Sequence, residues 1–341
     1  MTPFRNTPPE RATPASQRAP VLAALDLGTN NCRLLIATPA PNEPQGFRVI
    51  DAFSRIVRLG EGLSRHSQLQ ESAIGRTLEA LGVCQRKLQR HAVTHARAVA
   101  TEACRRAGNG AAFLAKGSKL LGLEIEVIES GEEARLAMLG CAPLLAPVTP
   151  HAIMFDIGGG STELIWLQLN GDGRPALIDH ISVPCGVVSL TEEYGGDLVS
   201  DDAYAAMVER VRGQLLDFDR KHGISAALKS GQVQMVGSSG TVTTLAGVLH
   251  GLVRYQRSLI DGCTMQVAEA RQVTERIRVL DFKGRSAIPC IGQERADLVV
   301  AGCAILQAIY ETWPVIQFRV GDRGLREGIL TDLLDEIAGA V

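Results

Sequence analysis

Two segments of this chain share one pattern, in which an apolar run leads into an aspartate and then into a glycine-containing turn. In the first segment, Val21–Leu25 precedes Asp26-Leu27-Gly28-Thr29-Asn30-Asn31. In the second, Ile153–Phe155 precedes Asp156-Ile157-Gly158-Gly159-Gly160-Ser161-Thr162. Glycines let the main chain approach a phosphate closely, and successive backbone N–H groups form an anion-binding concavity. The recurrence favours two related α/β halves whose loops face each other across a cleft.

The acids in these loops indicate a divalent cation. A carboxylate repels a phosphate, so Asp26 and Asp156 make sense if a cation such as Mg²⁺ lies between the two. Glu163, two residues past Ser161, is a candidate for a further acid that supports the ligands of the same ion. The simpler alternatives are an ordinary turn for the first loop and an ordinary strand residue for Glu163.

A third glycine loop, Gly237-Ser238-Ser239-Gly240-Thr241, follows the predicted strand Gln232–Val236. It opens the helix-like segment Val242–Ala246, and a helix that starts at a glycine turn can bind an anion through its free N–H groups. The alternative is a tight strand-to-helix connection. The segment has neither the Walker nor the Rossmann glycine spacing.

Charged pairs supply candidates for the chemistry itself. Glu132 and Glu133 open a predicted helix, residues 130–140, with Ser130 as its expected N-cap. Both acids suit a helix N-terminus, but one of them could reach the cleft and act as a general base for water. Arg105 follows the predicted strand Ala96–Ala100, whose end should lie at the cleft, where an arginine would neutralise phosphoryl oxygens. A solvated helix face is the simpler interpretation of that arginine.

Composition limits the class of protein. The chain has 341 residues, 45% of them hydrophobic, which is enough for two domains with a buried core. A net charge of −2 argues against a global nucleic-acid-binding surface. The eight cysteines form no C-x-x-C pair, which favours a reduced, cytoplasmic protein. Residues 1–20 are rich in Pro, Arg, Thr and Ser and predict a disordered tail, and no apolar run is long enough to cross a membrane.

Strands and helices alternate along the chain, which predicts an α/β fold. The proline-containing segment Cys141–Pro150 marks an expected linker. We expect domain I to span 21–140, completed by a C-terminal helix at about 327–341, and domain II to span 141–326. The expected strands are 21–25, 33–37, 47–52, 96–100, 125–128, 163–169, 177–183, 232–236 and 315–320, and the expected helices are 72–88, 113–121, 130–140, 201–221, 267–280, 294–312 and 324–338.

Together these segments resemble the exopolyphosphatase / guanosine pentaphosphate phosphohydrolase family, in a short form without its C-terminal helical domain. The family belongs to the acetate-kinase, sugar-kinase, chaperone and actin fold group, so the resemblance implies a duplicated two-domain actin-like fold with an interdomain cleft. The matching segments are Ala24–Leu34, Val57–Leu63, Ala100–Arg105, Ser130–Leu136, Asp156–Leu164, Gly237–Thr244, Glu294–Asp297 and Gly324–Gly328.

The resemblance implies metal-dependent hydrolysis of the terminal phosphoanhydride of inorganic polyphosphate. Glu133 would be the base, Arg105 would bind the attacked phosphate, and Asp26, Asp156 and Glu163 would hold Mg²⁺ or another divalent cation. Guanosine pentaphosphate is the alternative substrate. An ATP-dependent kinase or ATPase, a non-catalytic sensor and a homodimer stay open. The expected phosphate-binding residues are Gly28, Thr29, Asn30, Asn31, Arg33, Gly158, Gly159, Gly160, Ser161, Thr162, Gly237, Ser239, Gly240 and Thr241.

Overall fold

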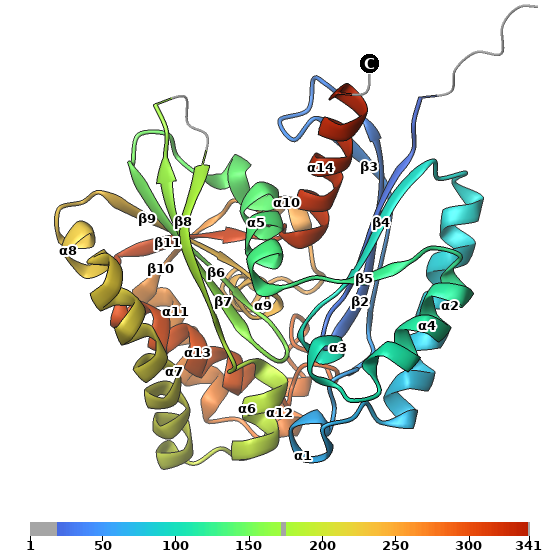
Figure 1. The fold of residues 1–341 in the computed structure, drawn as a ribbon. Helices are drawn as coiled ribbons and strands as arrows, with labels where there is room; N and C mark the ends of the chain where they lie inside the picture. Colours follow the sequence, from blue (N-terminus) through green and yellow to red (C-terminus); the bar gives the residue numbers. More distant parts are fainter. Residues whose placement is uncertain (1–18, 172–174, 340–341) are drawn as a thin grey trace, which may run out of the picture.

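The computed structural model describes residues 19–171 and 175–339. The predicted tail, residues 1–20, therefore lies outside the described residues except for its last two. The chain forms two β-sheets side by side, with two helices between them (Figure 1).

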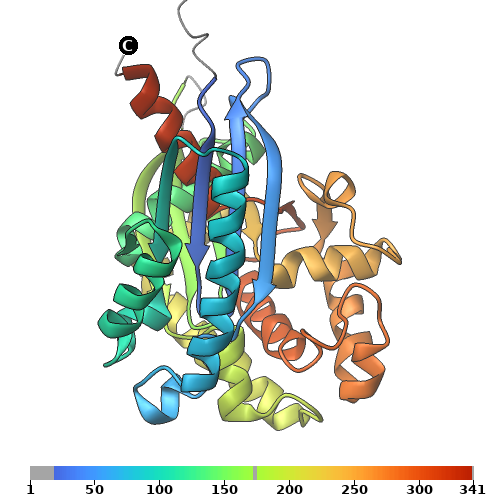
Figure 2. The same ribbon diagram turned by 90° about the vertical axis from the view of Figure 1, so that its right-hand side faces the viewer.

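The first sheet is ordered β3-β2-β1-β4-β5. Its first three strands are antiparallel neighbours, and β4 and β5 continue the sheet parallel to β1. Helix α2 crosses the outer face of this sheet, with α4 beside it (Figure 2). The elements are β1 (Leu22–Leu27), β2 (Asn31–Pro39), β3 (Phe47–Ile56), α1 (Leu63–His66), α2 (Glu71–Arg90), β4 (His95–Ala100), α3 (Glu102–Arg106), α4 (Gly110–Leu121) and β5 (Ile125–Val127).

The second sheet repeats this arrangement. Its order, β8-β7-β6-β9-β11-β10, has the same antiparallel trio followed by parallel strands, with β10 added at the edge. This confirms the predicted duplication. The elements are β6 (His151–Ile157), β7 (Thr162–Leu169), β8 (Pro175–Val183), α6 (Val187–Tyr194), α7 (Asp201–His222), α8 (Ile224–Lys229), β9 (Val233–Ser238), α9 (Gly240–Leu249), α10 (Arg257–Ile260), β10 (Thr264–Gln266), α11 (Val267–Arg278), α12 (Phe282–Ser286), α13 (Val299–Thr312) and β11 (Gln317–Gly321).

Helices α5 (Ser130–Cys141) and α14 (Leu325–Gly339) pack against each other between the sheets. The crossing is close, because a Cβ on Gly328 would overlap the α5 backbone at Leu136, and a Cβ on Gly140 would overlap the carbonyl group of Gly324, just before α14. Helix α5 contributes side chains to the hydrophobic clusters on both sheets. Its Leu136 joins the α14 cluster on the first sheet, while its Ala137 packs in the cluster on the second. The expected domain boundary at 140 stays a prediction.

Several local expectations were wrong. Ser130 is the first residue of α5 and caps nothing with its side chain, because Glu129 takes the N-cap position. The predicted helix 294–312 begins only at Val299, since the preceding residues form a turn. The glycine loop after β9 is shorter than expected, because β9 runs to Ser238 and α9 starts at Gly240. Short helices such as α3 and α6 had no sequence prediction.

All eight cysteines lie in the described part and are free thiols. Within residues 19–171 and 175–339, no helix combines the length and the apolar character needed to cross a membrane.

Candidate active site

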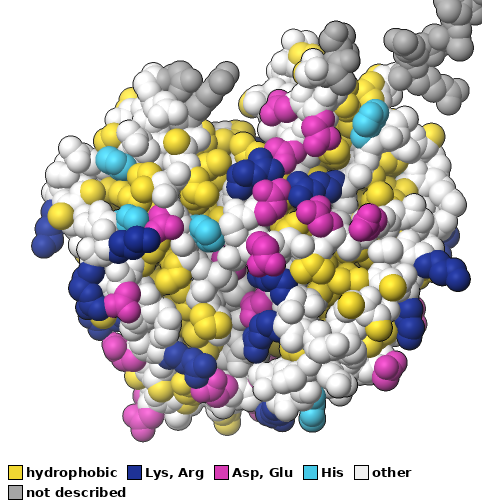
Figure 3. All heavy atoms as spheres, in the orientation of Figure 1, with side chains coloured by type: hydrophobic (Ala, Val, Ile, Leu, Met, Phe, Trp, Pro, Cys, Tyr) yellow, Lys and Arg dark blue, Asp and Glu magenta, His cyan; other side chains and the backbone are white. Residues whose placement is uncertain are grey.

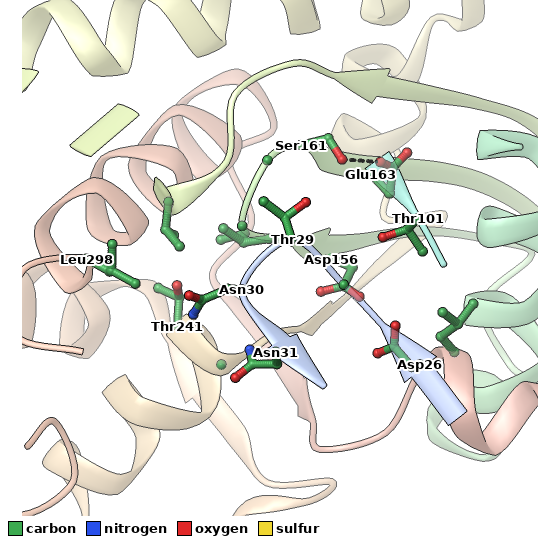
Figure 4. Close-up of a pocket in the computed structure, with 18 of the residues that line it drawn as sticks. Asp26, Thr29, Asn30, Asn31, Thr101, Asp156, Ser161, Glu163, Thr241 and Leu298 are labelled. Carbon is green, nitrogen blue, oxygen red and sulfur yellow. Dashed lines mark hydrogen bonds between the residues drawn. The ribbon is translucent and has the colours of Figure 1, made fainter. Parts of the chain in front are cut away.

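A cavity lies where the two halves meet, at the ends of β1 and β6. It is lined from the first half by both the loop after β1 and strand β2, and from the second half by the loops after β6 and β9. Figure 4 shows Asp26 and Asp156 pointing into the same space. The lining includes Asp26, Gly28, Thr29, Asn30, Asn31, Arg33, Glu133, Asp156, Gly158, Gly159, Gly160, Ser161, Glu163, Gly240 and Thr241 among the predicted residues, together with Thr101, Thr244, Arg295 and several apolar side chains.

The two aspartate-led loops have the same backbone turn. The Gly28 N–H donates to the Asn31 carbonyl at 2.9 Å, and the Gly158 N–H donates to the Ser161 carbonyl at 2.9 Å. The strand registers also correspond, because Asp26 lies opposite Arg33 and Asp156 lies opposite Glu163. Arg33 and Glu163 therefore occupy equivalent places in the two halves, one basic and one acidic.

The two loops touch at Gly159. A Cβ there would come within 3.1 Å of Thr29 and Asn30, so the close approach of the two loops favours glycine. Behind the second loop, the first N–H groups of α6 donate to the Gly158 carbonyl at 3.0 Å and the Gly159 carbonyl at 2.8 Å. Those contacts use the carbonyl groups of the loop. The Gly158 N–H closes the turn, so the N–H groups of Gly159 and Gly160 are the ones left for an anion.

Burial makes the two aspartates reluctant to ionise. Removal from water raises the pKa of Asp26, and Arg33 partly opposes this effect. The same desolvation raises the pKa of Asp156 to about 7, again against the pull of Arg33, and the Asp26 carboxylate adds to the increase. A cation between the two would relieve this cost.

Glu133 on α5 also lies in the cavity wall, and Arg105 holds it. The Arg105 guanidinium donates to Glu133 Oε2 at 3.0 Å and to the Ile128 carbonyl at 2.5 Å. Burial, with Glu163 nearby, raises the pKa of Glu133 to about 8 despite Arg105. A carboxylate with a pKa near neutrality suits a general base.

Glu163 has one satisfied oxygen and one orphan. Its Oε1 accepts from Ser161 Oγ at 2.8 Å and from Ser182 Oγ at 2.7 Å. Its buried Oε2 has no partner among the described residues, and burial raises the pKa of the carboxyl. This oxygen, Glu163 Oε2, is available to bind a cation or a proton.

Arg295 lines the cavity, although no role was predicted for it from the sequence. Its Nη1 donates to Thr244 Oγ1 at 2.7 Å and to the Gly240 carbonyl at 3.3 Å, at the start of α9. Burial and the nearby Arg33 lower its pKa. Neither Arg33 nor Arg295 has an ion-pair partner within the described part of the chain, so both guanidinium groups are available to bind an anion. The only sequence signal for Arg295 was the family-like segment Glu294–Asp297.

The family comparison agrees with this geometry. The model of the Ppx/GppA phosphatase family matches residues 40–337. The chain belongs to this family. It is 28% identical to exopolyphosphatase 2 of Mycobacterium tuberculosis, over 92% of this chain and 98% of that protein. Among solved structures, the Ppx/GppA member of Aquifex aeolicus is 28% identical, with a TM-score of 0.75 over 94% of this chain and 99% of that one. An exopolyphosphatase from Cytophaga hutchinsonii shares the fold at 24% identity, with a TM-score of 0.82 over 93% and 98%.

Membership of the Ppx/GppA family makes the protein a hydrolase with the duplicated actin-like fold.

Four of the site residues predicted from the sequence do not line the cavity. Thr162 is buried and donates to the Cys185 carbonyl at 2.7 Å. Gly237 leaves room for the Phe155 ring. Ser239 caps α9 by accepting from the Val242 N–H at 3.0 Å. Arg105 donates to Glu133 from outside the cavity wall.

The cavity acids are candidate ligands of a cation. The described residues contain no group of three or more His, Cys, Asp or Glu side chains arranged to hold a metal ion. Mg²⁺, however, is commonly held by one or two carboxylates, with waters and substrate phosphates completing its shell. Asp26 and Asp156, with raised pKa values and facing one cavity, fit that kind of site.

Proposed function

We propose that this protein hydrolyses the terminal phosphoanhydride of inorganic polyphosphate and releases orthophosphate, in a Mg²⁺-dependent reaction. One observation carries the proposal: two matching phosphate loops and a carboxyl with a pKa of about 8, that of Glu133, meet in one cavity. The exopolyphosphatase names of its relatives support the same substrate class.

The residues divide the work as follows. In the loops Gly28–Asn31 and Gly158–Ser161, the N–H groups of Gly28 and Gly158 close the turns, and the others hold phosphate oxygens. Arg33 and Arg295 balance the phosphate charge. Glu133 removes the proton from the attacking water, and Arg105 fixes the orientation of that carboxyl. Direct contact between Arg105 and the attacked phosphate stays a prediction.

Asp26 and Asp156 would hold Mg²⁺, and Glu163, whose buried Oε2 has no hydrogen-bond partner among the described residues, would be a third ligand. When bound, the ion stabilises the negative charge that spreads over the phosphoryl oxygens. The three acids otherwise repel the substrate, so chelation should abolish phosphate release.

Replacing Glu133 with Gln tests the assignment of the base. The variant keeps the shape but cannot take a proton, so the turnover number should fall about a hundredfold or more. Glu132→Gln is the matched control, because the neighbouring Glu132 binds Arg97 and Arg135 outside the cavity. Wild-type turnover in Glu133→Gln would show that another group is the base.

Substrate choice requires a direct comparison of phosphate release from long-chain polyphosphate, guanosine pentaphosphate and ATP, each with Mg²⁺ and with chelator. The proposal expects polyphosphate to be the best substrate. The cavity also has an apolar wall, which includes Leu298 and Val299 near Arg295, and preference for the guanosine compound would make that wall a nucleoside site. Preference for ATP would indicate a kinase or ATPase, and binding without release would indicate a sensor.

A further inference from the structure

A segment of the first half, residues 57–65, reaches across to the second half outside the cavity. Arg58 makes a bidentate ion pair with Asp297, with its Nη1 2.7 Å from Oδ2 and its Nη2 3.0 Å from Oδ1. The same Nη2 donates to the Glu294 carbonyl at 3.2 Å. Asp297 and Glu294 flank Arg295, which lines the cavity.

A second anchor lies on α6. The Glu192 carboxylate accepts from the Gly62 N–H at 2.6 Å and from the Ser64 hydroxyl, and the Glu192 carbonyl accepts from Arg65 Nη2 at 3.1 Å. Figure 1 shows α1 next to α6 at the bottom of the molecule. The N-terminus of α6 is the part that holds the carbonyls of the second phosphate loop.

The same segment is also bound to the first phosphate loop. The Val57 and Arg58 N–H groups donate to the Asn30 carbonyl at 2.9 and 3.0 Å, and the Gly60 N–H donates to the Thr29 carbonyl at 2.9 Å. Arg58 has a positive φ of 51°, which an arginine adopts at a cost. These contacts hold it there, with its side chain directed at the other half.

We propose that residues 57–65, Glu192 and Asp297 form an interdomain clasp that sets how the two phosphate loops and Arg295 face one another. The clasp is bound to Thr29 and Asn30, which line the cavity, and it contacts the segments that carry Arg295 and Val187, which also line it. Arg58, Glu192 and Asp297 themselves are not in the cavity wall. They are positioning residues. Only the kinetic consequence of the clasp rests on the proposed hydrolysis.

The Arg58–Asp297 pair is partly open to solvent, with side chains 32% and 22% exposed. Water screens such a pair, so we expect the protein to fold without it. Asp297→Asn removes the charge, and Arg58→Lys keeps the charge but loses the two-pronged geometry. The matched control is Glu61→Gln, because Glu61 belongs to the same segment but pairs with Arg76 inside the first half.

Amide hydrogen exchange of the free protein tests the clasp directly. In Asp297→Asn we expect severalfold faster exchange in both loops, residues 28–31 and 158–161, although neither contacts Asp297. Arg58→Lys should give a smaller increase and Glu61→Gln none. Faster exchange confined to residues 58–62 and 294–297 would show a merely local contact and overturn the proposal. If Asp297→Asn fails to fold, Arg58→Lys decides by the same criterion.

Kinetics with inorganic tripolyphosphate supply the second measurement. Misaligned loops should raise KM about fivefold in Asp297→Asn, while kcat changes by less than about twofold. An unchanged KM would contradict the clasp. If the wild-type protein releases no phosphate from tripolyphosphate, the proposed function fails, and the exchange measurement still decides the clasp by itself.

Discussion

At the scale of single residues, the site depends on carboxyls kept out of water. Burial raises the pKa of Glu133 to about 8, and a base must be ionised to act. We therefore expect kcat/KM for polyphosphate to rise with pH up to about 8 and then to level off, since this parameter reports the free enzyme. A pH–rate profile checks this. A profile that is flat between pH 6 and 8 would contradict a role for Glu133 as the base.

At the scale of elements, the crossing of α5 and α14 holds Glu133 against the cavity. A methyl group on Gly328 would overlap the Leu136 backbone, so Gly328→Ala should lower the free energy of unfolding by about 3 kcal/mol through overpacking. The control is Gly75→Ala in α2, where a Cβ meets nothing within 4 Å. It should raise stability by up to about 1 kcal/mol. Denaturant unfolding measures both, and equal stability of the two variants would show that the helices can separate cheaply.

At the scale of the whole molecule, charged side chains gather along the boundary between the halves on the face shown in Figure 3. The buried acids of the cavity lower the stability of the fold at neutral pH. The native state keeps the Asp156 proton up to a pKa of about 7, whereas the unfolded chain releases it near 3.8. The native state binds more protons in this range, so stability falls as pH rises from about 4 to about 7.

Asp156→Asn should therefore raise the melting temperature at pH 8, without divalent cation, by about 2 °C or more. Mg²⁺ should raise it for the wild type but not for the variant. Asp51→Asn is the contrasting control, because Lys87 and His91 lower the pKa of Asp51. That carboxylate stabilises the fold above its unfolded pKa, so its loss should lower the melting temperature at pH 8. A lower melting temperature in Asp156→Asn would contradict the account of the buried acids.

Long elements could be predicted from the sequence, because a helix such as α2 repeats its apolar face over many turns. Helices of four to six residues, such as α1 and α3, have no such repeat and were missed. The position of Ser130 was also misjudged, since any helix N-terminus with a serine and two acids suggests a cap, and only the backbone angles show which residue precedes the first turn.

The sequence by itself determined the two glycine turns and the aspartate that precedes each one, because a glycine turn and its closing hydrogen bond lie within four consecutive residues. It also indicated the duplication and the family. Only the tertiary structure decided that Arg295 joins Arg33 in the cavity, that Thr162, Gly237 and Ser239 lie outside it, and that Arg58 meets Asp297. Those contacts join residues far apart in the chain, and their partners are set by how the two halves pack.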